Sequence, residues 1–163
     1  MELDPKLDRA YRLLERGYER QRAGDLDAAR QLYQASIQER PTAEAHTYLG
    51  WTYSFQGKFD LAIEQYKTAI LVDPDFGNPY NDIGSYLIQK GELDKAIPWL
   101  QLAKKASRYE PRHFPYLNLF RVYLKQGRLD EAQREFEQAR FIQEEMEMEA
   151  GVPPDDDEPA ITH

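Results

Sequence analysis

Apolar and polar residues follow one another along most of this chain with the spacing of amphipathic α-helices. Four glycines, Gly24, Gly57, Gly91 and Gly127, interrupt the pattern, and one helical segment precedes and another follows each of them. The pattern predicts four helix-turn-helix units, at about residues 7–42, 43–76, 77–112 and 113–150. We therefore expect an all-α domain over residues 1–150.

The same short phrase surrounds each of these glycines: glycine, a variable residue, a large apolar residue, aspartate, another variable residue and alanine. Consecutive glycines are 33, 34 and 36 residues apart. A period in this range is typical of a stack of helical repeats, in which each unit packs only against its neighbours. The repeat therefore predicts an α-solenoid rather than a globule built around one central core.

The repeated phrase also predicts how each turn is made. Glycine supplies the backbone freedom that ends the first helix. The recurring aspartates stand where we expect the second helix to begin, so that their side chains cap its first turn. They are Asp27, Asp60, Asp94 and Asp130. Pro41 and Pro74 are expected to end the second helices of the first two units, because proline has no N–H to donate.

Small, aromatic, apolar and proline residues recur at fixed places in every unit. In the second unit they are Leu49, Gly50, Tyr53, Ala62, Tyr66, Ala69 and Pro74. Over roughly residues 7 to 148 this pattern resembles the tetratricopeptide repeat (TPR) family, including bacterial members that are uncharacterised. The resemblance implies a right-handed α-solenoid, with these residues in its core and a concave groove that binds other proteins.

The fourth unit departs from the pattern. Phe120 stands where the other units have Gly17, Gly50 and Gly84, so its helices must lie further apart or its ring must turn outward. Two extra residues lengthen the connector before it, over residues 107–113. Its second helix lacks a closing proline and is expected to run on to about Ala150 as a helix that caps the stack.

The resemblance also implies which side chains line the groove, because the first helix of each repeat faces it. The aromatic half of this candidate groove and the polar half that follows it comprise Tyr11, Tyr18, Tyr48, Trp51, Phe55, Asn78, Asn81, Asp82, Ser85, Phe114, Asn118 and Arg121. Such a mixed surface suits an extended peptide or an amphipathic helix. The alternative is that some of these aromatic residues pack against neighbouring helices.

A narrower hypothesis concerns the polar half. Its primary contact residues would be Asn78, Asn81, Asp82, Asn118 and Arg121, because polar side chains gather there and the connector is longer. The opposite interpretation is that these polar groups satisfy one another and fix the turn. Removing Asn81 and Arg121 together would distinguish the two.

Charge and composition exclude several classes of function. The net charge is −8, and from Phe141 onward there are eight acidic residues and no lysine or arginine, whereas the rest of the chain is neutral. This distribution disfavours nucleic acid as a ligand. Residues 151–163, rich in proline and aspartate, are expected to be a disordered acidic tail. Without cysteine, a secretory signal or a long apolar run, the chain is expected to be cytoplasmic and not inserted in a membrane.

No motif for catalysis, a cofactor or a metal ion occurs, so we expect no enzyme activity, no cofactor and no metal site. Within the family, some co-chaperones hold acidic tails of heat-shock chaperones with paired basic residues. The matching positions here lack those pairs and include Asp82, so such tails are not expected partners. The sequence therefore favours a non-catalytic adaptor or assembly factor. The alternatives are a dedicated chaperone for a secreted client and a self-assembling scaffold.

Overall fold

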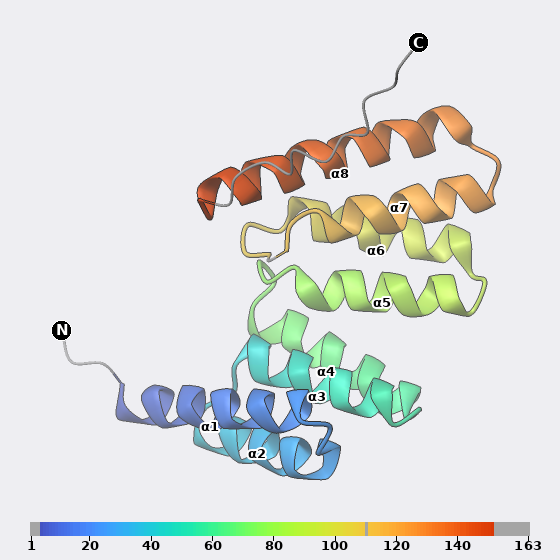
Figure 1. The fold of residues 1–163 in the computed structure, drawn as a ribbon. Coiled ribbons are helices and arrows are strands. Elements are labelled where there is room, and N and C mark those ends of the chain that lie inside the picture. Colours follow the sequence, from blue (N-terminus) through green and yellow to red (C-terminus); the bar gives the residue numbers. More distant parts are fainter. Residues whose placement is uncertain (1–3, 110, 152–163) are drawn as a thin grey trace. The chain divides into compact units, whose positions relative to one another are not determined.

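The computed structural model describes residues 4–109 and 111–151, which form an all-α structure with no named β-strand in these ranges (Figure 1). The eight helices of the described chain are α1 (Pro5–Arg22), α2 (Leu26–Glu39), α3 (Ala43–Phe55), α4 (Phe59–Val72), α5 (Asn78–Gln89), α6 (Leu93–Lys105), α7 (Phe114–Lys125) and α8 (Leu129–Glu149). The last helix is the longest, as expected from the missing proline. The acidic tail predicted over residues 151–163 lies, after Gly151, outside the described residues.

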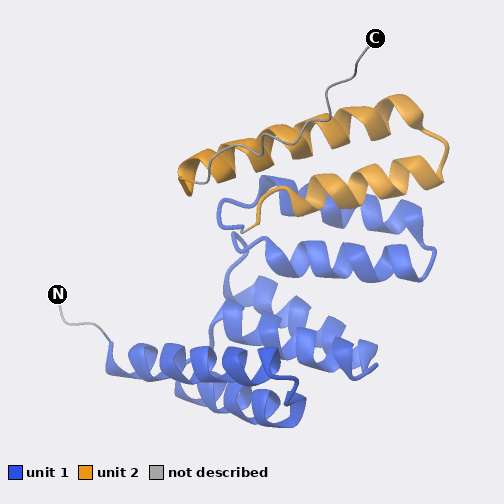
Figure 2. Ribbon diagram, in the orientation of Figure 1, with its two compact units in different colours: residues 1–110 blue, residues 111–163 orange. Residues whose placement is uncertain are grey.

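The chain divides into two compact units, Met1–Glu110 and Pro111–His163 (Figure 2). The boundary falls within the lengthened connector. In the N-terminal unit, α1 packs against α2, α3 against α4 and α5 against α6, and α2 and α4 also contact the helices that follow them. The C-terminal unit contains the single pair α7 and α8. Each unit is therefore built from helix pairs, three in the first and one in the second.

The turns within the pairs are made as the repeated phrase predicts. Gly24, Gly57, Gly91 and Gly127 have φ values of 83°, 74°, 79° and 72°, in the left-handed region that side chains with a Cβ disfavour. Gly151, with φ of 70°, follows the end of α8 in the same conformation. Pro41 and Pro74 each follow the C-cap residue of their helix, so the predicted stops are confirmed.

The expected position of the capping aspartates is wrong by two residues. Asp27, Asp60, Asp94 and Asp130 are the second residues of their helices and so lie inside the first turn. The cap of α2 is instead Asp25, whose carboxylate accepts a hydrogen bond from the Ala28 N–H at 3.1 Å. The side chains of the corresponding cap residues of α4, α6 and α8 make no capping hydrogen bond to the first turn of their helices. The recurring aspartates therefore act through their charge at the positive helix end.

Small residues let the paired helices of the N-terminal unit approach closely. A Cβ added to Gly17 would lie 2.6 Å from Tyr33 Cε1, and one added to Gly50 would lie 2.4 Å from Tyr66 Cε1. Gly84 meets Leu100 in the same way, at 2.6 Å. The space beside each glycine is thus filled by the large residue sixteen positions later. This confirms that these glycines are packing positions.

The connectors after α4 and α6 pair with each other in the N-terminal unit. Phe76 and Arg108 form an isolated parallel β-bridge, in which the Gly77 N–H donates to the Arg108 carbonyl at 2.8 Å. The Arg108 N–H donates to the Asp75 carbonyl at 3.0 Å. A Cβ on Gly77 would lie 2.9 Å from the Cβ atoms of Ala106 and Tyr109. This bridge fixes the start of α5, which carries much of the candidate site.

Pro98 is the sixth residue of α6 and lies in the helix interior, although proline has no N–H to donate. On α1, Arg16 and Arg20 are exposed to solvent. Over the ranges the structure describes, no helix is both long enough and apolar enough to span a bilayer.

Candidate partner-binding surface

The twelve residues predicted for the groove are divided between the two units. Nine lie on α1, α3 and α5 of the N-terminal unit, and Phe114, Asn118 and Arg121 lie on α7 of the C-terminal unit. Phe114 is 45% exposed, and the Asn118 side-chain oxygen accepts a hydrogen bond from Arg121 at 3.2 Å. The N-terminal unit therefore holds most of the candidate surface and is described first as a surface of its own.

Aromatic rings from α1 and α3 form a continuous series. The Tyr18 and Tyr48 ring centroids are 5.8 Å apart, and Tyr48 stacks on Trp51 at 4.6 Å with an interplanar angle of 23°. The Tyr11 hydroxyl donates to Glu44 at 3.3 Å. Tyr18 is 43% exposed and Phe55 is 69% exposed. The structure thus brings three of the predicted aromatic residues, Tyr18, Tyr48 and Trp51, into contact with one another.

Some of these residues also belong to the core, as the alternative interpretation proposed. Tyr48 is partly buried and packs against a cluster that includes Leu49 and Tyr33. Leu14 and Thr47, which stand at groove positions in the family pattern, are 6% and 0% exposed. Their helices are close enough to bury these side chains. The accessible aromatic surface therefore comes from Tyr11, Tyr18, Trp51 and Phe55.

The polar residues on α5 are unequally accessible. Asn81 is 6% exposed, so most of its side chain is unavailable to a partner. Asn78, Asp82 and Ser85 are partly buried. Of these, Asp82 has the most distinctive surroundings, because it lines a pocket whose walls are largely aromatic.

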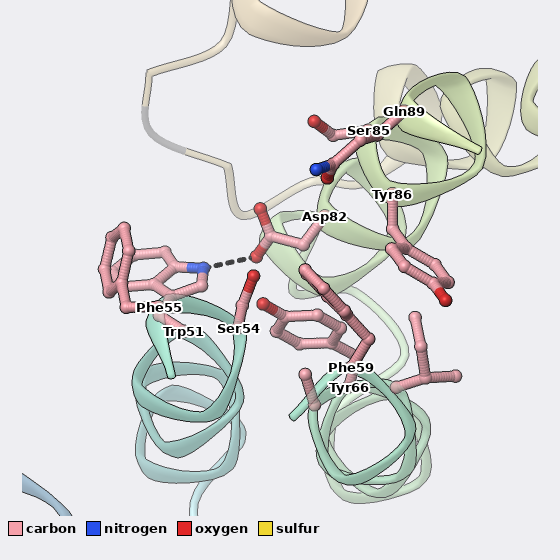
Figure 3. A pocket seen from close by; sticks show the side chains of 11 residues that line it. Trp51, Ser54, Phe55, Phe59, Tyr66, Asp82, Ser85, Tyr86 and Gln89 are labelled. Atoms are coloured by element: carbon pink, nitrogen blue, oxygen red, sulfur yellow. Dashed lines mark hydrogen bonds between the residues drawn. The ribbon is translucent and has the colours of Figure 1, made fainter. Parts of the chain in front are cut away.

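A pocket of about 260 Å³ is formed where α3, α4 and α5 meet (Figure 3). Each helix contributes a stripe of residues spaced three or four apart, as one helix face requires. The lining residues are Trp51, Ser54, Phe55, Phe59, Ala62, Ile63, Tyr66, Asp82, Ser85, Tyr86 and Gln89. Five of them are aromatic, and Asp82 is the one ionisable carboxylate among them.

Asp82 is held in this pocket by Trp51. The indole N–H donates to Asp82 Oδ2 at 2.5 Å, and Figure 3 shows the carboxylate directed toward the indole ring. Burial raises the pKa of Asp82 to about 7, and the hydrogen bond from Trp51 opposes part of that rise. The same burial, with the nearby Asp82 charge, raises the pKa of Tyr66. The pocket therefore combines apolar walls with a carboxylate that titrates near neutral pH.

Sequence reasoning found Trp51, Phe55, Asp82 and Ser85 but missed most of the other pocket residues. Phe59 and Tyr86, whose rings stack with centroids 5.2 Å apart, were not singled out, and Tyr66 was assigned only to the core. A signal was available on α5, because Asp82 and Tyr86 are four residues apart and share a helix face. No comparable signal in the sequence indicated that α4, the second helix of its repeat, would contribute residues such as Phe59 to the pocket.

Across residues 4–109 and 111–151, no three histidine, cysteine or acidic side chains gather in a way that could hold a metal ion. His46 Nδ1 is 2.7 Å from the Gln65 side-chain oxygen, in another shallow depression of the N-terminal unit. The depression contains no lysine, arginine or carboxylate, and Tyr53 is the other titratable residue that lines it.

Profiles of the tetratricopeptide repeat match residues 14–53, 43–76, 78–109 and 115–138. These matches cover most of the helical part of the chain, and each includes one of the four turn glycines or the helices around it. The chain belongs to the tetratricopeptide repeat family, and its helix pairs have the fold of that family.

Relatives of known sequence or structure are similar over most of this chain. Protein bimA of Emericella nidulans is 29% identical over 119 residues, which are 72% of this chain and 14% of bimA. The structure of pilF from Pseudomonas aeruginosa has a TM-score of 0.78 at 21% identity, over 85% of this chain and 63% of pilF. PilW, described as a widely conserved type IV pilus biogenesis factor, has a TM-score of 0.74 at 18% identity, over 88% of this chain and 70% of PilW.

The chain therefore spans about a seventh of bimA and less than two thirds of pilF. At these identities the likeness to the solved structures concerns the fold.

Proposed function

We propose that this chain is a non-catalytic protein-interaction module, an adaptor or assembly factor, that binds a peptide or helix of a partner along α1, α3 and α5. The observation that carries the proposal is the open aromatic series that runs from Tyr18 to Trp51 and ends in the pocket around Asp82. Exposed aromatic rings supply large apolar contact area at low entropic cost, and the pocket gives one side chain a defined place.

Membership of the repeat family and the description of PilW as a biogenesis factor support a role in assembly. A cytoplasmic location and a bacterial origin are part of the same proposal, and they rest on sequence composition and resemblance alone. Asp82, at the centre of the surface, would repel an acidic tail, so the proposed partner is not a carboxylate-rich chaperone tail.

A paired capture experiment tests the location of the site. Phe55 is 69% exposed at the mouth of the pocket, and Leu71 is 83% exposed on α4 but does not line it. Phe55→Ala and Leu71→Ala therefore remove comparable exposed apolar surface from two places. We expect quantitative mass spectrometry of captured proteins to show one partner lost with Phe55→Ala and retained with Leu71→Ala. Equal recovery with both variants would place the contact surface elsewhere.

The polar half of the predicted groove is tested in the same experiment. Arg121→Ala removes an exposed cation from α7 without removing a buried side chain. Loss of the partner with this variant would support the hypothesis that Asn118 and Arg121 take part in contact. If the only captured protein were further copies of this chain, the result would instead favour the self-assembling scaffold.

A further inference from the structure

The Asp82 carboxylate lines an aromatic pocket of the N-terminal unit, and no lysine or arginine of the described chain pairs with it. Glu44 pairs with Arg108, and Glu39 pairs with Arg9 at 3.2 Å, both at the protein surface. Asp82 instead lines the pocket, and its described hydrogen bond comes from the neutral Trp51 indole. A partly buried carboxylate without a counter-ion is costly, so its surroundings favour the arrival of a cation.

The walls of the pocket suit a cation as well. Aromatic faces attract ammonium and guanidinium groups through the ring quadrupole, most strongly where water is partly excluded. The pocket presents the rings of Trp51, Phe55, Phe59 and Tyr86 around a single negative charge. The chain already uses one of these rings in this way, because Lys90 Nζ lies 5.6 Å from the Tyr86 ring centroid. Lys90 also pairs with Glu92 at 3.5 Å.

We propose that this pocket receives a lysine or arginine side chain of the partner segment, with Asp82 as the counter-ion and Trp51, Phe55 and Tyr86 as the aromatic walls. This inference rests on the proposed function, since it names the chemistry that the same surface recognises. The indole of Trp51 fixes Oδ2 and leaves Oδ1 to accept from the incoming cation. The stem of the basic side chain lies against the aromatic rings.

Binding is expected to strengthen as the pH rises from 6 to 8. The pKa of Asp82 is raised to about 7 by burial, so the carboxylate is mostly protonated at the lower pH and mostly ionised at the higher one. Tyr66 and Tyr109, which interact electrostatically with Asp82, have raised pKa values and stay neutral over this range. Lys90 remains on Tyr86 and paired with Glu92. A cation needs the ionised carboxylate, so its affinity should rise about tenfold.

The first experiment selects ligands from a displayed library of random twelve-residue peptides. The full chain is compared with Asp82→Asn, which keeps an acceptor for Trp51, and with Glu64→Gln, which removes the same charge from an exposed position on α4 outside the pocket. We expect the wild type and Glu64→Gln to enrich a lysine or arginine at one fixed position. Asp82→Asn should lose that preference and bind the best peptide at least about tenfold more weakly.

The outcomes separate this inference from the proposed function. Peptides that bind the wild type without a fixed basic residue, or that bind Asp82→Asn equally well, would overturn the cation pocket and leave the interaction module standing. Failure to enrich any peptide would count against both. Replacing the basic residue of the best peptide by norleucine should cost about tenfold with the wild type and little with Asp82→Asn.

A second measurement tests the pocket without any partner. The indole N–H of Trp51 is followed by NMR while n-butylammonium, or the neutral n-butanol, is added to the full chain. We expect a saturable shift with the ammonium that grows between pH 6 and pH 8 and is absent in Asp82→Asn. Equal shifts with both compounds would show a purely apolar pocket and contradict the proposal.

Discussion

The three helix pairs of the N-terminal unit and the single pair of the C-terminal unit use the same two positions in opposite ways. In the first three pairs a glycine on one helix meets a large residue sixteen positions later, and Tyr33, Tyr66 and Leu100 are 0%, 4% and 0% exposed. In the fourth pair, Phe120 meets Phe136 with ring centroids 5.1 Å apart, and Phe136 is 40% exposed. Two large rings cannot occupy the space of one, so the second ring turns partly into solvent.

This difference shows what the glycine contributes. It allows two helix backbones to approach until a single ring or branched side chain fills the space between them. In the fourth pair, Phe120 is partly buried, and its partner Phe136 is the ring that is exposed to solvent. The N-terminal unit therefore has tight layers that can hold a pocket at their edge, whereas the C-terminal pair presents an aromatic surface.

The largest effect is expected from adding a single carbon to a tight layer. Gly50→Ala places a Cβ 2.4 Å from Tyr66 Cε1, and Tyr66 is only 4% exposed. The helix propensity of alanine offsets about 1 kcal/mol, so we expect a net loss of about 2–3 kcal/mol in the free energy of unfolding. Urea denaturation followed by circular dichroism measures it.

A compensating variant keeps this prediction specific. The third pair shows that leucine fits beside the glycine position, so Gly50→Ala combined with Tyr66→Leu should recover part of the lost stability. An additive loss in the double variant would show that the clash is not the cause.

The next largest effect concerns the Asp82 carboxylate of the N-terminal unit. The fourth repeat has Asn118 at the corresponding position. Burial raises the folded-state pKa of Asp82 from 3.8 to about 7. The stability linked to this group is therefore present below pH 4 and is lost as the pH rises through 7. Asp82→Asn removes the titration, so it should stabilise the protein at pH 8 by on the order of 2 kcal/mol and have little effect at pH 4.5.

Thermal unfolding at the two pH values checks this prediction. Glu64→Gln, an exposed change on α4, is the control and should show the same melting temperature difference from wild type at both. A stabilisation by Asp82→Asn that does not depend on pH would mean that Asp82 is ionised throughout.

The fold could be predicted because local chemistry repeats. The turn glycines and the prolines after α2 and α4 each act within a few residues, so a single sequence reports them. The helix starts were misplaced because an aspartate such as Asp27 is common both at the cap position before a helix and inside its first turn. An aspartate stabilises a helix both as a cap and inside the first turn, and the two readings differ by only two positions.

The candidate site was only partly predictable, for a different reason. The faces of α3 and α5 follow from helical spacing, which is why Trp51 and Asp82 were both found. Their hydrogen bond joins residues 31 positions apart and depends on how closely the helices pack. The contribution of Phe59 and Tyr86 depends on the same packing, which is set by Gly50 and its neighbours rather than by any motif.

A smaller effect is expected in the C-terminal unit. Phe120→Ala removes a ring that is only partly buried, and Phe136 can turn inward to cover part of the space. We expect a loss of about 1–1.5 kcal/mol, less than a fully buried phenylalanine would cost. Hydrogen exchange resolved to α7 and α8 measures it. A loss of 3 kcal/mol or more would show that this pair is packed as tightly as the others.

The smallest effect concerns the end of α8, where the C-terminal pair is most open. Phe141 is 59% exposed and Met148 is 71% exposed, and Arg112 pairs with Glu149 at 3.3 Å across the pair. Glu149 is well exposed and Arg112 is partly exposed, so Arg112→Ala should change the free energy of unfolding by less than about 0.5 kcal/mol. It should speed hydrogen exchange only in the last turn of α8, and Glu149→Ala should do the same. Faster exchange throughout α7 and α8 in either variant would show that this ion pair stabilises both helices along their length and not only the end of α8.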